Sequence, residues 1–135
     1  MTKKFIFTYR WCNDLGKIKS FYSGVLGLEP VWDTDEVIAF KIHDHQLSFN
    51  YDSSLVMPEP VFSSQLGWEG GTAHRTSWSI ECSGQEFKDI VKRAQKSGVK
   101  SFYPEPKWVG YWSYPILDPM NETIEITCTD TELYK

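Results

Sequence analysis

The stretch GYWSYPILDPMNETIEITC, residues 110–128, carries most of the information about the fold. Two runs rich in aromatic and β-branched residues flank the tetrapeptide 118–121, Asp-Pro-Met-Asn, whose first two residues favour a tight turn. The stretch therefore predicts a β-hairpin. Its second arm alternates, with apolar Ile124, Ile126 and Cys128 on one face and polar Thr123, Glu125 and Thr127 on the other. Glu125 then faces either bulk water or a cavity, and in a cavity it would be the strongest candidate for a functional group.

Composition narrows the class of protein. With 135 residues, 41% of them hydrophobic, the chain predicts one domain with a real core. A net charge of -4 with no basic stripe argues against a nucleic-acid partner. No apolar run predicts a membrane span or a signal peptide, so we expect a cytoplasmic protein. The three widely spaced cysteines, Cys12, Cys82 and Cys128, favour reduced buried thiols over a disulfide framework or a zinc site.

The first 52 residues predict the order β-α-β-β-β. A strand over 5–11 precedes a helix that Asn13 or Asp14 can cap and Gly27 can end. The helix places Ile18, Phe21, Tyr22 and Val25 at helical spacing. Further strands are expected at 31–32, 37–42 and 46–51. The tripeptide His43-Asp44-His45, between the last two of these strands, contains residue types that bind metal ions. Such a tripeptide more often forms a solvated turn.

Residues 53–75 predict a long connection rich in proline, serine and glycine. A long connection in a small domain often covers a binding site, which would make Phe62 and Trp68 lid residues. The alternative, which we favour, is a surface loop with its aromatic side chains packed on the core.

Residues 76–135 predict the same order a second time. A strand over 76–82 leads to a helix that Gly98 ends, followed by strands at 99–103, 110–117 and 122–128. The apolar face of this helix contains Phe87, Ile90, Val91 and Ala94. Two copies of one order predict two modules of one architecture.

Several motifs resemble the vicinal oxygen chelate superfamily, which contains glyoxalase I, bleomycin-resistance proteins, fosfomycin-resistance proteins and extradiol dioxygenases. Residues 13–15, 21–22 and 26–28 (Asn-Asp-Leu, Phe-Tyr and Leu-Gly-Leu) resemble its first helix, and residues 118–126 resemble its closing hairpin. The resemblance implies an α+β fold in which two βαβββ modules form a curved mixed sheet around one small-molecule cavity. It also implies a homodimer, by analogy alone.

The resemblance implies metal ligands on the first and last strand of each module. Alignment of the two predicted helices puts Thr8, Ser48, Ser77 and Glu125 at those positions. A one-residue slip would replace Thr8 by Phe7. Neither set contains an imidazole or a thiolate, whereas catalytic transition-metal sites typically use three His, Cys or carboxylate ligands. We therefore expect no metal cofactor; if a divalent ion such as Zn, Ni or Mn were bound, Glu125 would be its ligand.

The same alignment predicts which side chains point into the cavity. Glu125 would bind the ligand, act as a catalytic base or form a structural ion pair with Arg10. Arg10, if inward, would anchor a carboxylate or phosphate. Rings on the funnel walls could stack on a planar or cationic ligand, although strand aromatics are more often core. The predicted ligand-binding residues are Thr8, Arg10, Ser48, Asn50, Ser77, Trp108, Trp112, Tyr114 and Glu125.

Three functions follow as hypotheses. The first is a metal-free protein that binds a small aromatic or cationic compound, similar to bleomycin-resistance proteins. The second is a metal-dependent lyase or isomerase similar to glyoxalase I (lactoylglutathione lyase), with Glu125 as base or ligand. The third is a regulatory module whose cavity has lost its ligand.

Overall fold

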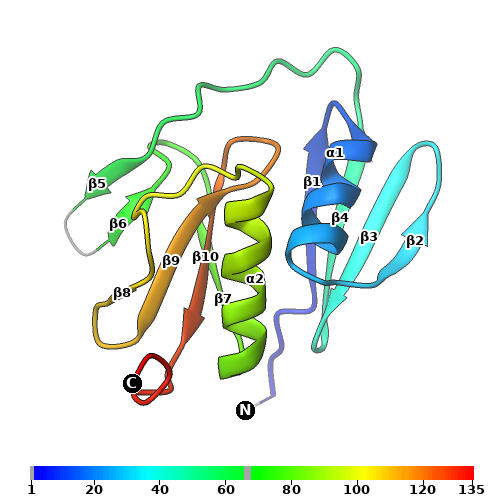
Figure 1. Cartoon of the computed structure of the whole chain (residues 1–135). Helices are drawn as coiled ribbons and strands as arrows, with labels where there is room; N and C mark the ends of the chain where they lie inside the picture. Colours follow the sequence, from blue (N-terminus) through cyan, green and yellow to red (C-terminus); the bar gives the residue numbers. More distant parts are fainter. Residues whose placement is uncertain (1, 66–67) are drawn as a thin grey trace. The chain divides into compact units, whose positions relative to one another are not determined.

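The predicted hairpin is present at the end of the chain. In the computed structural model, which describes residues 2–65 and 68–135 apart from the side chains of Gln65 and Trp68, β9 (Trp112–Leu117) pairs antiparallel with β10 (Thr123–Cys128) (Figure 1). The carboxylate of Asp118 accepts hydrogen bonds from the backbone N–H groups of Met120 (2.9 Å) and Glu122 (3.1 Å). Asn121 adopts a positive φ of 58°, which asparagine tolerates better than most residues. Asp and Asn therefore set the turn.

The chain forms two units, one up to Met57 and one from Pro58 to Lys135. In the first, the helix predicted near Ile18 is split into α1 (Leu15–Lys19) and a π-helical segment η1 (Ser20–Val25). Asp14 caps α1 by accepting from the Lys17 backbone N–H at 3.0 Å. Gly27 follows η1 with a φ of 76°, as expected of a helix terminator.

The first unit's sheet has the strand order β1-β4-β3-β2. Its strands are β1 (Phe7–Cys12), β2 (Pro30–Asp33), β3 (Val37–Ile42) and β4 (His45–Tyr51). β1 runs parallel to β4 and the other pairs are antiparallel. The ring of Tyr22 packs against the rings of Phe40 (5.4 Å between centroids) and Phe49 (4.9 Å), so one sheet face meets the helix.

The second unit repeats this arrangement with the strand order β7-β10-β9-β8. Helix α2 (Gly84–Lys96) lies between β7 (Trp78–Glu81) and β8 (Lys107–Trp108) in the chain. As predicted, α2 buries Phe87, Ile90, Val91 and Ala94. The chain is therefore α+β with two four-stranded mixed sheets of βαβββ type, which confirms the predicted fold class. The single cavity that the resemblance implies stays a prediction.

Two details differ from the prediction. Residues 99–103 pair with β9 only through the isolated bridge between Ser101 and Ile116, and Pro104, which has no N–H to donate, follows directly. The strand forms later, as β8. The connection is also not structureless, since it contains the antiparallel pair β5 (Ser63–Gln65) and β6 (Trp68–Gly71).

No helix in the described part of the chain is long and apolar enough to span a bilayer.

Candidate functional site: hydroxyl groups around Glu125

Glu125 lies in the middle of β10 with only 5% of its surface exposed, so it does not face bulk water. One carboxylate oxygen, Oε1, accepts a hydrogen bond from the hydroxyl of Ser79. The other, Oε2, accepts from the hydroxyls of Ser113 at 2.6 Å and Tyr111 at 3.2 Å. The carboxylate is thus held by three hydroxyl donors from two segments of the second unit, β7 and residues 111–113 at the start of β9.

Strand register explains this grouping. Glu125 is the register partner of Ser79 on the parallel strand β7, so the two side chains share a face. On the antiparallel strand β9, Ser113 is opposite Thr127, which puts it one diagonal step from Glu125 on that face. Tyr111 precedes β9 and follows Gly110, whose φ of 106° is one that glycine adopts readily.

Burial and negative charge keep the nearby phenols protonated. The pKa of Tyr111 is raised, first by burial, then by the charge of Glu125 and the hydrogen bond to it. The pKa of Tyr103 is raised by burial, by the charge of Glu69 and the hydrogen bond to it (3.4 Å), and more weakly by Glu125. Both phenols therefore remain hydrogen-bond donors at neutral pH.

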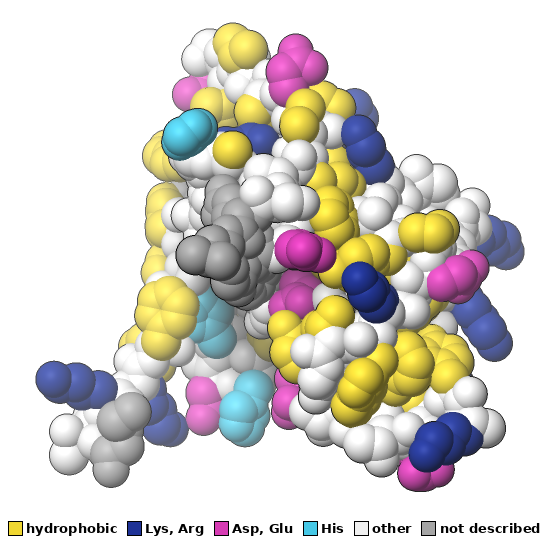
Figure 2. All heavy atoms as spheres, turned by 90° about the vertical axis from the view of Figure 1, so that its left-hand side faces the viewer, with side chains coloured by type: hydrophobic (Ala, Val, Ile, Leu, Met, Phe, Trp, Pro, Cys, Tyr) yellow, Lys and Arg dark blue, Asp and Glu magenta, His cyan; other side chains and the backbone are white. Residues whose placement is uncertain are grey.

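Figure 2, which views the side where β5 and β6 lie in Figure 1, shows acidic side chains among hydrophobic ones.

The β5–β6 hairpin packs against the polar face that carries Glu125. The hydroxyl of Thr123, two residues before Glu125, donates to the carbonyl of Gly70 at 2.7 Å. Phe62, the first predicted lid residue, packs its ring against the half-buried ring of Phe102, with 5.5 Å between centroids. Whether the connection acts as a lid stays a prediction. The side chain of Trp68, the other predicted lid residue, lies outside the described residues.

The predicted faces of Thr8 and Arg10 in the first unit are wrong. Thr8 is the register partner of Leu47 and Arg10 of Phe49, so both lie on the face that meets the helix. Arg10 Nη1 donates to the Tyr22 hydroxyl at 2.9 Å, and its guanidinium lies 4.9 Å from the centre of the Phe49 ring. The alignment of the two predicted helices, which puts Tyr9 and Trp11 on the helix-facing side, is therefore one residue out of step in β1.

Ser48 and Asn50 lie on the opposite face of the first sheet, as predicted, beside Tyr9 and Trp11 in register. In the second unit, Ser77 accepts from the backbone N–H of Thr72 at 3.0 Å, so its hydroxyl helps to hold the turn before β7. Whether any of these three binds a ligand stays a prediction.

The expected funnel-wall aromatics lie on the other face from Glu125. Tyr114 is opposite Ile126 and Trp112 opposite Cys128, both on the apolar face of β10. Trp112 donates its indole N–H to the carbonyl of Asp130 at 3.1 Å, and Trp108 packs edge-on against Trp112. Trp108, Trp112 and Tyr114 therefore do not share a face with Glu125, and their expected role in ligand binding stays a prediction. The residues of this segment that do contact Glu125 are Tyr111 and Ser113. The sequence does not indicate which face they share, because Pro115 interrupts the pattern of the strand.

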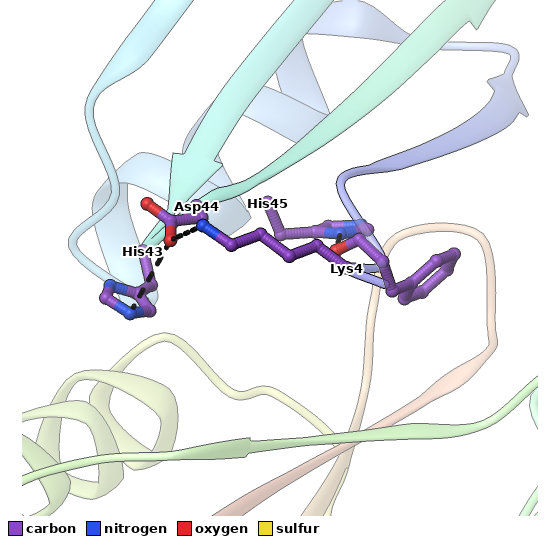
Figure 3. A network of polar contacts seen from close by, with 5 residues as sticks. Lys4, His43, Asp44 and His45 are labelled. Carbon is purple, nitrogen blue, oxygen red and sulfur yellow. Dashed lines mark hydrogen bonds and ion pairs between the residues drawn. The ribbon is translucent and has the colours of Figure 1, made fainter. Parts of the chain in front are cut away.

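The histidine cluster is a structural network in the first unit (Figure 3). His43 lies in the turn with a φ of 51°, and Asp44 pairs with Lys4 at 3.3 Å. His45 belongs to β4 and joins the hydroxyl of Thr8 (2.7 Å) to the carbonyl of Phe5 (2.9 Å). These contacts tie the start of the chain to the sheet.

The donor set around Glu125 does not fit a catalytic transition-metal site. Three of its four groups are Ser or Tyr hydroxyls, whereas such sites typically use three ligands of His, Cys or carboxylate type. Over residues 2–65 and 68–135, no group of three His, Cys, Asp or Glu side chains is placed to hold a metal ion.

Comparison with known proteins agrees with this fold. The chain is similar to a glyoxalase/dioxygenase from Nostoc punctiforme, with 18% identity, 95% of this chain and 92% of that one covered, and a TM-score of 0.76. It is also similar to a fosfomycin resistance protein from Mesorhizobium loti (14% identity, 98% and 96% covered, TM-score 0.65). A lactoylglutathione lyase from Agrobacterium tumefaciens gives 17% identity, 97% and 96% coverage, and a TM-score of 0.63. No curated protein sequence matches the chain.

Fold and site together place the chain among proteins built from paired βαβββ modules. The family model of the Glyoxalase/Bleomycin resistance protein/Dioxygenase superfamily matches residues 6–126, and the chain belongs to that superfamily.

Proposed function

We propose that this chain binds a small molecule that carries a positively charged group with several N–H donors, and that Glu125 accepts hydrogen bonds from this group. The main support for this proposal is that the hydroxyls of Ser79, Ser113 and Tyr111 all donate hydrogen bonds to the Glu125 carboxylate. A hydroxyl has one hydrogen, so these three have only lone pairs left to offer, and a carboxylate only accepts.

This arrangement favours some ligands over others. An ammonium, guanidinium or amidinium group carries positive charge and several donors, which complement a negatively charged, acceptor-only surface. A ligand carboxylate or phosphate would be repelled by the charges of Glu125 and Glu69. The ligand class is therefore cationic, which is one of the two classes that the sequence predicted.

Binding without a metal cofactor is part of the proposal, because the hydroxyl-rich donor set supports it. The alternative is a metal-dependent lyase similar to glyoxalase I, and the observation in its favour is that Glu125 occupies a position where the superfamily resemblance implies a metal ligand. Elemental analysis after incubation with Zn, Ni or Mn, together with an assay for turnover of the methylglyoxal–glutathione adduct, separates the two. Stoichiometric metal with turnover would replace the binding proposal.

The direct test is calorimetric titration with benzamidine, whose amidinium sits on a flat ring. Benzoate has the same ring with the opposite charge, and benzyl alcohol has it with none. We expect benzamidine to bind most tightly. Glu125→Gln should weaken that binding by about tenfold or more, since a hydrogen bond to a charged group contributes about 1.5–3 kcal/mol.

Glu36→Gln is the matched control, because Glu36 is an exposed acid in the first unit. It should leave benzamidine affinity unchanged. Equal affinities of wild type and Glu125→Gln, or tighter binding of benzoate than of benzamidine, would contradict the proposal.

We also propose, by analogy with the superfamily, that the protein acts in the cytoplasm as a homodimer. Light scattering at two protein concentrations tests the dimer. A mass of 15.7 kDa at both would contradict it.

A further inference from the structure

Two cysteines of the second unit lie opposite each other where the strands β7 and β10 end. Thr127 on β10 is the register partner of Glu81 on the parallel strand β7. The next residues along the two strands are Cys128 and Cys82. The backbone N–H of Cys82 donates to the Thr127 carbonyl at 2.8 Å, which is the bond that a parallel ladder makes when Cys82 is paired with Cys128. The two cysteines are therefore neighbours on adjacent strands.

Their side chains also share a face of the sheet. Side chains alternate along a strand, so Cys128 lies on the apolar face of β10 that carries Ile126. Cys82 lies on the same face, because it follows Ile80, the register partner of Ile126, by two residues. Neighbouring strands are about 4.7–4.9 Å apart. A disulfide joins Cα atoms that are about 4.4–6.8 Å apart, so the strand spacing allows a bond between these thiols, which are unlinked in the structure.

The two thiols differ in their access to solvent. Cys128 is 2% exposed, whereas Cys82 is only partly buried. Residues 129–135, which follow Cys128, fold back beside the start of α2 (Figure 1). In this segment the ring of Tyr134 packs edge-on against Phe87 of α2, with 6.4 Å between centroids. A reagent in solution therefore reaches Cys82 before it reaches Cys128.

We propose that Cys82 and Cys128 form a redox modification site, at which a low-molecular-weight disulfide converts the two thiols into an intramolecular disulfide. In the first step, the Cys82 thiolate attacks one sulfur of the small disulfide, which forms a mixed disulfide and releases one thiolate. In the second step, the Cys128 thiolate attacks the Cys82 sulfur and releases the other thiolate. The two released thiolates take up the two protons that the cysteines lose. The protein is thereby oxidised by two electrons and the small disulfide is reduced to two thiols.

The surroundings of Cys82 determine how fast this site reacts. Burial raises the pKa of its thiol to about 12, with further contributions from Glu86, Cys128 and Glu81. Thiolate is therefore scarce at neutral pH, and the first step is slow. The second step is fast by comparison, because the strand register holds Cys128 beside the mixed disulfide. The site should therefore respond to sustained oxidising conditions and not to brief ones.

The inference goes beyond the binding function proposed above and uses no residue that contacts Glu125. Either one can fail without the other. In reducing compartments, disulfides are usually transient and serve catalysis or redox sensing, so the expected bond is a reversible one.

The test is overnight incubation of the reduced, folded protein with bis(2-hydroxyethyl) disulfide at pH 9, stopped with acid and followed by mass spectrometry without reduction. This probe is small and uncharged, so Glu81 and Glu86 do not repel it. Wild type should lose the mass of two hydrogen atoms and carry no mercaptoethanol. Digestion should give one linked pair of peptides, which contain Cys82 and Cys128. In urea, the linked peptides should also include Cys12, because unfolding removes the strand register.

Variants separate the two steps. Cys128→Ser removes the second thiol and should trap mercaptoethanol on Cys82. Cys82→Ser should remain unmodified in the folded protein, because the thiol left in the pair is buried. Cys12→Ser is the matched control, since Cys12 is a buried cysteine of the first unit, and the bond between Cys82 and Cys128 should form as in wild type.

Three results would overturn the inference. Folded wild type would stay fully reduced overnight, or it would keep mercaptoethanol on Cys82 without forming the bond to Cys128. Alternatively, the bond would join Cys12 or link two copies of the chain. The peptide map of wild type needs no variant, so it decides the question even where a substitution prevents folding.

Discussion

Ser113 donates its hydroxyl hydrogen to Glu125 Oε2 at 2.6 Å although the two residues are not register partners. The bond runs diagonally from β9 to β10, and both side chains are buried. Because Pro115 is the residue directly opposite Glu125, the diagonal neighbour supplies the donor on this side of the carboxylate.

Ser113→Ala should therefore lower the free energy of unfolding by about 1–3 kcal/mol, the cost of a lost hydrogen bond to a buried charged acceptor. Urea denaturation followed by fluorescence measures it. Ser53→Ala, at an exposed serine, should change stability by less than about 0.5 kcal/mol. Equal stability of Ser113→Ala and wild type would show that Ser113 contributes little to holding Glu125.

The fold was predictable because each module repeats the same order of periodic segments, and because Asp14, Gly27 and the turn after Leu117 carry unambiguous local signals. The site was predictable only in part. Glu125 follows from the clean alternation of β10, whereas Arg10 was assigned to the wrong face. Alternation determines which residues share a face, but it does not determine which face meets the helix. In β1 the face that carries Arg10 meets the helix, where the hydroxyl of Tyr22 accepts a hydrogen bond from the guanidinium.

Alkaline pH should destabilise the protein through Tyr111. Its pKa in the folded state is raised by burial and by Glu125, so above about pH 10 the unfolded chain loses this proton before the folded one does. The folded state then binds more protons, and stability falls as pH rises from about 10 to the folded pKa. Tyr111→Phe should remove this part of the loss between pH 8 and pH 11.

Urea denaturation at each pH gives the comparison. Tyr51→Phe, at a more exposed tyrosine, should retain the wild-type slope. If Tyr111→Phe and wild type lose stability in parallel above pH 10, the phenol is not coupled to Glu125 as the geometry indicates.

Cys82 should be a poorly reactive thiol. Burial raises its pKa to about 12, with further contributions from Glu86, Cys128 and Glu81. An unperturbed cysteine has a pKa of about 8.5, so at pH 8 the thiolate fraction is lower by roughly a thousandfold, and the thiolate is the nucleophile. Iodoacetamide should therefore label Cys82 far more slowly in the folded protein than in urea. Peptide mass spectrometry follows each cysteine separately, and folded-state labelling within about tenfold of the urea rate would contradict this pKa.

Gly70 joins the β5–β6 hairpin to the face that carries Glu125, and its substitution tests that support. Its φ is 86°, and a Cβ added there would lie 3.0 Å from the ring of Pro115. Gly70→Ala should therefore destabilise by more than about 1 kcal/mol, since the backbone strain and the contact act together. Gly24→Ala is the matched control: nothing lies within 4 Å of its added Cβ, and the residue is helical, so a neutral or stabilising effect is expected.

Gly70→Ala also separates packing from binding. The Gly70 carbonyl accepts from Thr123, two residues before Glu125 on β10, so displacement of the hairpin disturbs the strand that holds the carboxylate. We expect Gly70→Ala to weaken benzamidine as well as lower stability, whereas Gly24→Ala should do neither. If Gly70→Ala lowers stability but leaves benzamidine affinity intact, the hairpin supports the core of the second unit without positioning Glu125.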